Sequence, residues 1–396
     1  MPVSQRLDRF RGSLLGLAIG DALGAPLEGL SPQQIRAHYH QVTDYVDGAK
    51  AWKKKPFRWR LPGLYTDDTQ QALALADVLV ETRHADLRRL SEIYVALATP
   101  DLGYAGAHRG VGKSFRQVLA DLKRGVCPKQ TGQPSAGIGA AMRIAPVALY
   151  FAETPELLFE AVMAVSLMTH RDIRSLAGAF AVALGVVRLL DHPADRPDPS
   201  FVLWLAADVA KAEARIAREY ADSVYSLDVH RGSMSAAIAH VETVLDLPRE
   251  RALQAILEEA NRHGPDTGVR RATQGFPPAC IPACLYLLLT SDSLAEALIE
   301  VVNMGGDADS TGAILGSFAG ALYGAEAIPA RWLTALQNRD AIDVRARAIF
   351  QKSSEGLDIP DLISSEFELS AREAENREFL LSHPPFGGDL GANKRI

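Results

Sequence analysis

Two short segments, far apart in the chain, carry the same unusual set of side chains. TDDT at 66–69 and DADST at 307–311 each place two carboxylates and two hydroxyls at the start of an alanine-rich stretch. Such residues are favoured at helix N-termini, where their oxygens accept hydrogen bonds from backbone N–H groups. One cap requires one such residue, so the surplus carboxylates indicate chemistry beyond capping.

Metal binding is the chemistry that we expect. Unpaired carboxylates that meet in a dry site repel one another and are costly to bury. A divalent cation removes that cost, and hard oxygen ligands of this kind suit Mg²⁺, Mn²⁺ or Ca²⁺ rather than zinc. We therefore expect the two segments to bind metal, with simple helix capping as the alternative.

The elements that must position these residues have the apolar spacing of helices. Apolar residues recur at i, i+3 and i+4, and no βαβ rhythm interrupts the pattern. We expect an all-α protein, in which the Pro/Asp stretch at 191–200 is a surface connection and not a domain border. The predicted helices are 68–82, 140–152, 173–190, 201–218, 234–246, 249–262, 292–303 and 310–323.

A stripe of glycines marks two of the helical segments. Glycine recurs every four residues from Gly12 to Gly24 and again from Gly312 to Gly320. Glycine inside a helix costs roughly 0.8–1 kcal/mol relative to alanine, so a glycine face requires a compensation such as close backbone packing. We expect both helices deep in the core and near each other, with Gly20 and Gly24 lying beyond the end of the first helix.

Composition and charge exclude several classes of protein. The 396 residues carry a formal net charge of −6, which gives no electrostatic reason to expect nucleic acid as a partner. Three cysteines are too few for a disulfide framework, and Cys280 and Cys284 are expected to be small core residues. No apolar run was identified that reaches the roughly 18–20 residues of a membrane span, and the N-terminus lacks an apolar signal core. We expect a cytoplasmic protein without membrane contact.

The end of the chain differs from the rest. Residues 1–350 have one continuous helical texture and are expected to form a single domain. Residues 351–396 are expected to be a C-terminal extension, with an acidic amphipathic helix followed by a poorly ordered tail.

Five blocks of the sequence together resemble a known family. They are GSLLGLAIGDALGAPLEG, YTDDTQQALAL, SAGIGAAMRIAPVALYF, SLMTHRDIRSLAGAFAVALG and NMGGDADSTGAILGSFAGALYG, which span about positions 10–325. In this order they are similar to the ADP-ribosylglycohydrolases, the group of dinitrogenase-reductase-activating glycohydrolase and the ARH-type ADP-ribosylhydrolases. The resemblance implies a compact orthogonal multi-helix fold with a binuclear Mg²⁺ or Mn²⁺ site in a central cleft. It also implies hydrolysis of the glycosidic bond between ADP-ribose and a modified side chain or small molecule.

The resemblance also implies roles for individual residues. It implies metal ligation by one cluster in each half of the chain, and Ser310 stands where relatives usually have threonine, which leaves Thr311 as a competitor. It places Glu28 beside the metals and a glycine-rich loop along the phosphates and ribose, although Ile138 stands where relatives usually have a polar residue. The implied metal ligands are Thr66, Asp67, Asp68, Asp307, Asp309 and Ser310, and the implied substrate-binding residues are Glu28, Ser135, Gly137, Gly139 and His170.

The chemistry of glycoside hydrolysis explains why such parts are needed. The anomeric carbon develops oxocarbenium character as water attacks it. Two metal ions can hold the ribose diol and present a polarised water, and a nearby carboxylate can orient that water or take its proton. The candidates for this catalytic carboxylate are Glu28, Asp67, Asp68 and Asp309, which the sequence alone leaves undivided.

One basic and aromatic segment has no place in this scheme. KAWKKKPFRWRLPG at 50–63 concentrates lysine and arginine with three aromatic residues. We interpret it as a solvated loop leading to the first carboxylate cluster, with contact to the macromolecular part of a substrate as the alternative.

The leading functional hypothesis is a metal-dependent hydrolase that removes ADP-ribose from arginine and uses two Mg²⁺ or Mn²⁺ ions. Its partners would be ADP-ribosylated proteins or small molecules. Hydrolysis of serine-linked or nucleobase-linked ADP-ribose stays open. A non-catalytic ADP-ribose-binding or immunity protein that neutralises a toxin partner is the alternative from another class.

Overall fold

The computed structural model describes residues 1–98, 106–193, 196–264 and 268–383. Within these ranges every regular element is a helix, and strand-like pairing is limited to two isolated bridges, Gln133 with His170 and Asp172 with Tyr225. The all-α prediction is therefore confirmed. The poorly ordered tail that the sequence predicts falls on 384–396, outside the described residues.

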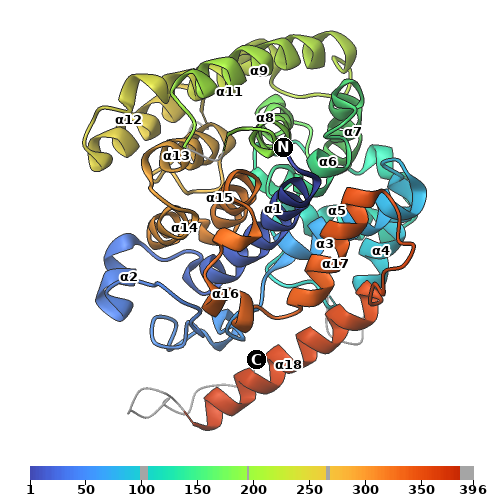
Figure 1. Cartoon of the computed structure of the whole chain (residues 1–396), viewed down its shortest axis with the longest axis vertical. Coiled ribbons are helices and arrows are strands. Elements are labelled where there is room, and N and C mark those ends of the chain that lie inside the picture. Colours follow the sequence, from blue (N-terminus) through green and yellow to red (C-terminus); the bar gives the residue numbers. More distant parts are fainter. Residues whose placement is uncertain (99–105, 194–195, 265–267, 384–396) are drawn as a thin grey trace.

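Two antiparallel helices, α1 (Val3–Gly24) and α15 (Ala308–Tyr323), form the centre of the molecule (Figure 1). Their glycine stripes face each other residue by residue, from Gly12 against Gly320 to Gly20 against Gly312. A Cβ atom added at Gly16 would lie only 2.2 Å from the carbonyl oxygen of Gly316. The contact thus exists because neither backbone carries a side chain there, and it compensates for the low helix propensity of glycine.

The expectation that Gly20 and Gly24 lie beyond the first helix is wrong. Helix α1 continues through Gly24, which lies against Ala308 at the start of α15. The close backbone contact with α15 extends along the whole stripe, so these two glycines are held in helical conformation by the same packing as the others.

A shell of helices surrounds this pair. The α14, α13 and α8 helices pack on α15, and α17 packs on α1. The outer helices α9, α11 and α12 lie together at the top of Figure 1, next to α8 and α13. The bounds are α2 Pro32–Tyr39, α3 Asp67–Thr82, α4 Leu87–Leu97, α5 Lys113–Lys123, α6 Ala145–Tyr150, α7 Pro155–Leu167, α8 Ile173–Leu190, α9 Ser200–Glu219, α10 Leu227–His230, α11 Ser233–His240, α12 Arg249–Arg262, α13 Pro277–Thr290, α14 Leu294–Asn303, α16 Ala330–Ala335, α17 Arg339–Gln351 and α18 Leu362–Ser382.

Most predicted helices agree with the structure to within two residues, but two are shorter than expected. The segment predicted at 140–152 forms a helix only at Ala145–Tyr150, because Pro146 lacks an N–H group and is tolerated only in the first turn. The segment predicted at 234–246 ends its α-helix at His240, whose carbonyl accepts a hydrogen bond from the hydroxyl of Thr243. On α13, Cys280 and Cys284 are free and fully buried, as predicted for small core residues.

Among the described helices, α8 alone is long and apolar enough to cross a membrane by itself, and 89% of that window is buried inside the fold. The segments Val3–Leu27 and Pro32–Tyr39 pass the same test only when taken together, and they are bent by 85°. A buried core helix has this composition for the same reason as a membrane span, because both lack contact with water.

The last described helix, α18, packs on α3, α4 and the short 3₁₀ turn Pro56–Arg58. It begins at an Asp361 cap whose carboxylate accepts from the backbone N–H of Ser364, and it runs along the lower edge of the molecule (Figure 1). A helix is therefore present at Leu362–Ser382, in the part of the chain where the sequence predicts one.

Candidate active site

One cleft, with a cavity volume of about 660 Å³, collects nearly all the residues singled out in the sequence. The start of α3 and the start of α15 form one side of it, and the glycine-rich loop before α6 forms another. The predicted residues that line the cleft are Glu28, Asp67, Asp68, Ser135, Gly137, Gly139, His170, Asp307, Asp309 and Ser310. Segments that are far apart in the sequence thus meet at one place, as a split site requires.

Thr66 is the predicted residue that does not line the cleft. It is fully buried, and its hydroxyl lies 2.9 Å from Asp21 Oδ1 and 3.1 Å from Asp68 Oδ2. Its neighbour on α1, Asp21, accepts from the backbone N–H groups of Thr66 and Thr69 at 2.9 and 3.0 Å. Asp21 of α1 therefore caps α3 from outside that helix, and this contact fixes where the first carboxylate cluster begins.

The start of α15 is held mainly by its backbone. The N–H of Asp307 donates to the carbonyl of Thr273 at 2.5 Å, and the hydroxyl of Thr311 donates to the carbonyl of Asp307 at 2.5 Å. Ser310 lines the cleft, whereas the Thr311 hydroxyl is used inside its own helix. Of the two hydroxyls that compete as a metal ligand in the sequence, the serine is the one placed at the cleft.

Helix capping does not account for the two clusters. The residues at the N-cap positions, Thr66 of α3 and Asp307 of α15, make no side-chain cap hydrogen bond. The carboxylates of Asp67, Asp68 and Asp309 lie within the first turns and line the cleft. Their presence is left to be explained by what occupies the cleft.

Burial and mutual repulsion strongly disfavour the ionised form of each aspartate in the cleft. Burial raises the pKa of Asp67 to about 8, and the neighbouring charges of Asp21 and Glu28 add to that rise. Burial also raises the pKa of Asp68 and of Asp309 well above the ordinary value, and for both the next causes are other carboxylates. The pKa of Asp307 is likewise raised, chiefly by burial. A positive charge placed among them would reverse this cost.

The donor set fits a hard divalent cation. All four aspartates offer carboxylate oxygens, and Asp68 Oδ1 is buried without a hydrogen-bond partner. Within residues 1–98, 106–193, 196–264 and 268–383, no three His, Cys, Asp or Glu side chains converge closely enough to hold a metal ion as they stand. The fit therefore rests on the chemistry of the donors and on their shared cleft, not on a finished coordination geometry.

The glycine loop and His170 lie directly against each other. A Cβ atom at Gly139 would lie 2.9 Å from His170 Cε1, so the imidazole reaches this position only because glycine stands there. Burial lowers the pKa of His170 to about 3, which keeps the ring neutral, and the charge of Arg143 contributes. Ile138 stands where the resemblance implies that relatives usually have a polar residue. It is 4% exposed and belongs to the main apolar core.

A buried chain of hydrogen bonds connects the metal side of the cleft with the glycine-loop side. Gln71 Nε2 donates to Asp67 Oδ2 at 2.6 Å, and Gln71 Oε1 accepts from Arg143 Nη1. Arg143 Nη2 donates to Thr169 Oγ1 at 2.6 Å, which lies 2.8 Å from His170 Nδ1. When the Thr169 hydroxyl donates a hydrogen bond to Nδ1, the neutral ring carries its proton on Nε2, beside the glycine loop.

Sequence reasoning missed Gln71 and Arg143. Gln71 follows Asp67 by four residues on the same helix, so helical spacing could have placed it on the same face. No local signal marks Arg143, which comes from the turn before α6 and is 1% exposed. Three further basic side chains at the cleft, Lys113, Arg270 and Arg271, were also not singled out.

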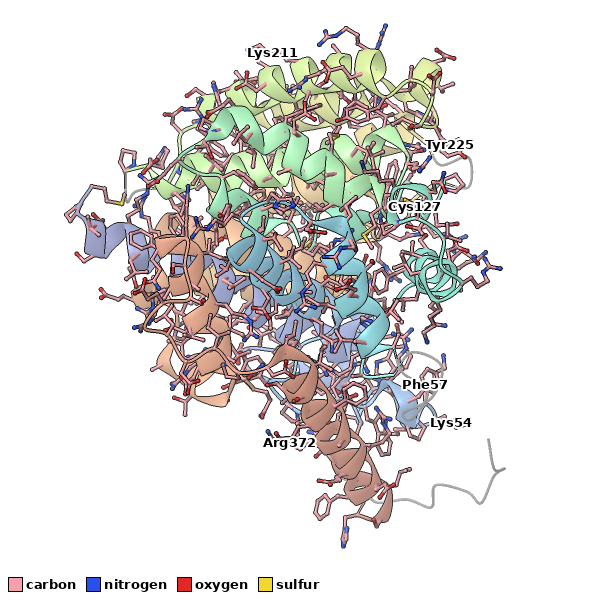
Figure 2. All side chains as sticks on the ribbon, turned by 90° about the vertical axis from the view of Figure 1, so that its right-hand side faces the viewer. Lys54, Phe57, Cys127, Lys211, Tyr225 and Arg372 are labelled. Atoms are coloured by element: carbon pink, nitrogen blue, oxygen red, sulfur yellow. The ribbon has the colours of Figure 1, made fainter. Side chains whose placement is uncertain are left out.

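The basic and aromatic segment divides into an exposed and an embedded part. Lys54 and Phe57 lie at the molecular surface in Figure 2, and the Phe57 side chain is 59% exposed. Trp59 is fully buried, and Arg58 Nη1 donates to Glu28 Oε2 at 2.6 Å. The solvated-loop interpretation holds for the lysines, while Arg58 joins the segment to the rim of the cleft.

Comparison with known proteins decides the family. The sequence profile of the ADP-ribosylglycohydrolase family matches residues 2–357. The chain belongs to the ADP-ribosylglycohydrolase family. Members of this family are hydrolases that act on glycosyl bonds of ADP-ribose.

Characterised relatives cover nearly the whole family match. An ADP-ribosyl-[dinitrogen reductase] glycohydrolase of Rhodospirillum rubrum is 28% identical over 89% of this chain and 98% of its own. The ADP-ribosylarginine hydrolase Tri1 of Serratia proteamaculans is 26% identical over 90% and 82%, and human ADP-ribosylhydrolase ARH3 is 26% identical over 88% and 96%. A solved structure described as an ADP-ribosylglycohydrolase-related protein complex is 27% identical, with a TM-score of 0.61 over 88% of this chain and 99% of that one.

Proposed function

We propose that this ADP-ribosylglycohydrolase cleaves the bond between ADP-ribose and an arginine side chain, and that it does so with two bound Mg²⁺ or Mn²⁺ ions. The observation that carries the proposal is the set of buried, mutually repelling carboxylates in one cleft beside a glycine-rich loop. The preference for arginine is supported by similarity to the ADP-ribosylarginine hydrolase Tri1 of Serratia proteamaculans. The substrate would be an ADP-ribosylated protein or a small molecule with the same linkage.

The metal ions would be held by oxygen ligands from both helix starts. Those ligands are Asp67 and Asp68 on α3, and Asp307, Asp309 and Ser310 at α15, with Thr66 holding Asp68 from behind. When bound, such ions polarise the ribose hydroxyls and lower the pKa of a bound water. Asp21 keeps the α3 ligands in place through its four contacts with Thr66 and Thr69.

Hydrolysis also requires a group that orients the attacking water and takes its proton. Glu28, Asp67, Asp68 and Asp309 all line the cleft and can do this as carboxylates. Glu28 differs from the other three because its partner is a cation, Arg58, and because its side chain is 28% exposed. One of these four carboxylates would position the attacking water. The three that are also metal ligands, Asp67, Asp68 and Asp309, would hold the ions that bind the ribose diol.

The rest of the substrate would lie along the other wall of the cleft. Backbone N–H groups of the loop that contains Ser135, Gly137 and Gly139 suit a diphosphate, and His170 can donate from Nε2 to a ribose or phosphate oxygen. Lys113, Arg270 and Arg271 supply positive charge at the same cleft. The aspartates of the cleft repel a ligand with two negative charges, and the three basic side chains offset that repulsion when the ligand enters the cleft.

A panel of defined linkages tests the proposal. Arginine-, serine- and nucleobase-linked ADP-ribose are incubated with the protein in Mg²⁺, in Mn²⁺ and in EDTA, and released ADP-ribose is quantified. We expect release from the arginine linkage with either metal and none in EDTA. Release from another linkage alone would correct the substrate, release in EDTA would overturn the metal dependence, and binding of ADP-ribose without turnover on any linkage would favour the non-catalytic alternative.

A further inference from the structure

Helix α18 lies beyond residues 2–357, which the family profile matches, yet it touches the candidate active site from behind at two places. Its first half contacts the residues around the start of α3. Its second half contacts the segment that carries Arg58. The contacts in the two halves are made by different residues and reach different lining residues of the cleft.

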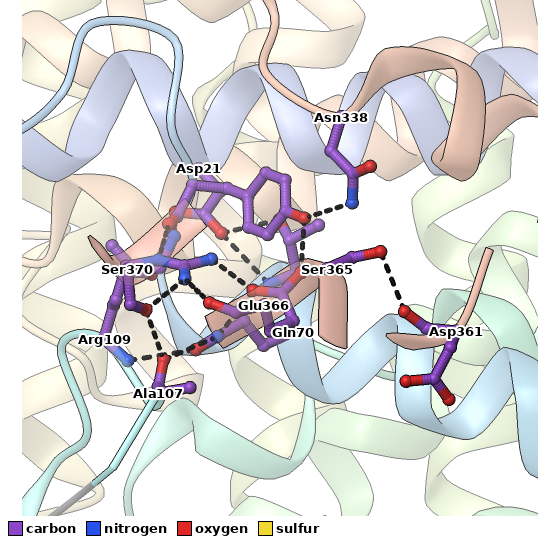
Figure 3. A network of polar contacts seen from close by, with 12 residues as sticks. Asp21, Gln70, Ala107, Arg109, Asn338, Asp361, Ser365, Glu366 and Ser370 are labelled. Atoms are coloured by element: carbon purple, nitrogen blue, oxygen red, sulfur yellow. Dashed lines mark hydrogen bonds and ion pairs between the residues drawn. The ribbon is translucent and has the colours of Figure 1, made fainter. Parts of the chain in front are cut away.

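In the first half, Glu366 is the centre of a buried polar network (Figure 3). Its side chain is fully buried, and its carboxylate accepts from the hydroxyl of Tyr65 at 2.6 Å and from Gln70 Nε2 at 2.7 Å. It also accepts from Arg109 Nη2 at 2.5 Å. Tyr65 and Gln70 flank the first carboxylate cluster in the sequence, so Glu366 is hydrogen-bonded to the residues on both sides of that cluster.

Arg109 connects Glu366 with Asp67, which lines the cleft. Its backbone carbonyl accepts from the N–H of Asp67 at 2.7 Å. The next residue, Gly110, lies so close to the cluster that an added Cβ would be 3.2 Å from Asp67 Oδ1. Ser370 completes the hold, because its hydroxyl donates to the carbonyl of Ala107 at 2.9 Å and accepts from Arg109 Nη1 at 2.9 Å. Residues 107–112 are thus clamped between α18 and Asp67.

The burial of this ion pair indicates positioning rather than stability. Glu366 and Arg109 side chains are 0% and 4% exposed. A buried ion pair is often no more stabilising than apolar residues of the same volume, and its best-attested use is to select one arrangement of the groups around it. The arrangement selected here is the backbone of Arg109 against Asp67.

The second half of α18 holds the segment next to Glu28. Asn376 Nδ2 donates to the carbonyl of Arg60 at 3.2 Å, Arg377 Nη2 donates to the carbonyl of Trp59 at 3.4 Å, and Leu380 packs with Ala49 and Trp59. This embedded segment presents Arg58 to Glu28 at 2.6 Å. The contacts of α18 therefore reach Glu28 through Arg58, just as they reach Asp67 through Arg109.

We propose that α18 is a built-in positioning element of this active site: Glu366 and Ser370 set the Asp67 side, and Asn376 and Arg377 set the rim that carries Glu28. The inference rests on the proposed function, since it takes Asp67 as a metal ligand and Glu28 as a residue at the metal site. None of the four α18 residues lines the cleft. They act through Arg109 and Arg58.

Two serines on α18 give a matched test of the first half. Ser370→Ala removes the contact with residues 107–112, whereas Ser365→Ala removes only a bond to the carbonyl of Asp361 at the start of the same helix (Figure 3). Mn²⁺ affinity, measured by calorimetry on the full-length protein, is expected to weaken about fivefold in Ser370→Ala. This is less than the roughly tenfold to hundredfold typical of groups bonded directly to a ligand. Ser365→Ala should bind as the wild type does, and Ser370→Thr, which keeps the hydroxyl, should restore affinity.

The second half is tested by how the kinetic effect divides. Asn376→Ala is expected to lower kcat for an ADP-ribosylated protein about threefold with Mn²⁺ affinity unchanged, because one neutral hydrogen bond that holds the segment next to Glu28 is lost. The neighbouring exposed Glu375→Ala serves as the control. A rise in KM with unchanged kcat in Asn376→Ala would overturn the assignment of this half to the positioning of Glu28.

The outcomes separate this inference from the proposed function. Wild-type protein that binds Mn²⁺, with Ser370→Ala and Ser365→Ala binding equally well, overturns the positioning role alone. The same two results, combined with a lower unfolding temperature for Ser370→Ala, would show that the contact serves only stability. Wild-type protein that binds no Mn²⁺ overturns the metal-dependent function and this inference together.

Discussion

The two helix starts that meet in the cleft have similar sequences but are held in different ways. At α3, side chains are fixed by side chains: Gln71 holds Asp67, and Thr66 lies beside Asp68. At α15, the backbone is fixed, through Thr273 and the Thr311 hydroxyl, and Asp309 Oδ1 accepts from the adjacent N–H of Ser310. The α3 cluster is therefore preorganised by neighbouring side chains, whereas the α15 cluster depends mainly on how its own backbone is held.

Neutralising one carboxylate in each cluster should have the largest effect. We expect Asp67→Asn and Asp309→Asn each to lower kcat/KM by on the order of 10³-fold, the size typical of losing a group that acts on developing charge. In EDTA both should raise the unfolding temperature, because each removes a buried carboxyl whose raised pKa costs stability at neutral pH, and Asp309→Asn should raise it more, since Asp67 already has a donor in Gln71.

Asp77→Asn is the control for this pair of variants. Asp77 lies further along α3 and is paired with Arg345 at 2.7 Å, so its neutralisation should lower the unfolding temperature. Calorimetry in EDTA measures all three variants. Lower unfolding temperatures for both site variants would contradict the view that the clusters are electrostatically strained.

The second effect in size concerns how the clusters are brought together. In Gly312→Ala the new Cβ would lie 2.3 Å from the carbonyl oxygen of Gly20, so α1 and α15 must move apart. We expect a loss of about 1–3 kcal/mol in unfolding free energy, as for overpacked cores, together with loss of turnover. Ala313→Gly, one residue along the same helix, should cost about 1 kcal/mol through helix propensity and retain activity. Full activity in Gly312→Ala would show that the spacing of the helices does not set the site.

A smaller effect is expected when the network that only the α3 cluster possesses is cut. Gln71→Leu removes the link between Asp67 and Arg143, and kcat/KM should fall by roughly tenfold to hundredfold, as for other residues behind a metal ligand. Gln117→Leu, at an exposed glutamine that bonds Asp121, is the control. Steady-state kinetics at saturating Mn²⁺ measures both, and equal activities would mean that Asp67 needs no such support.

The smallest effect is a pH dependence confined to the loop that supports the α3 cluster. Burial lowers the pKa of His108 to about 4, and its Nε2 lies 2.9 Å from the carbonyl of Tyr94. Between about pH 6.5, the ordinary histidine value, and pH 4 the unfolded chain binds more protons than the folded one. The contribution of His108 to stability is therefore complete above pH 6.5 and is lost as the pH falls.

Denaturant unfolding between pH 7 and pH 5 measures this dependence. We expect His108 to contribute a fall in the unfolding free energy of about 1 kcal/mol per pH unit within the window, and His108→Gln to remove that share of the slope. His84→Gln, at an exposed histidine, should leave the slope unchanged. An unaltered slope in His108→Gln would assign the dependence to other groups.

Much of the fold and the cleft follows from local sequence pattern. Helical periodicity predicts α8 with the first and last residues that the structure shows, and the spacing of glycines predicts the α1–α15 contact. The surplus of carboxylates at two helix starts points to a shared site before any fold is known. Each of these signals is repeated or concentrated within a few turns of one helix, and for this reason it can be read from the sequence.

What the sequence did not predict depends on single contacts between distant residues. Arg143 meets Gln71 across 72 positions and Glu366 meets Arg109 across 257, and neither pair carries a local signature. The prediction that Gly20 and Gly24 lie beyond the end of the first helix was wrong for a related reason. Helix propensity argues for a break there, and only the packing of α15, almost 300 residues later, outweighs it.

The contact between Gly12 and Gly320 also has a consequence for how the protein is made. On the ribosome, the N-terminal helix emerges long before its partner, and a chain grows by roughly 5–20 residues per second. During that interval α1 exposes the glycine-lined face that α15 covers in the folded protein. We expect the nascent chain to depend on chaperones in this period, and the cleft to form only when α15 arrives.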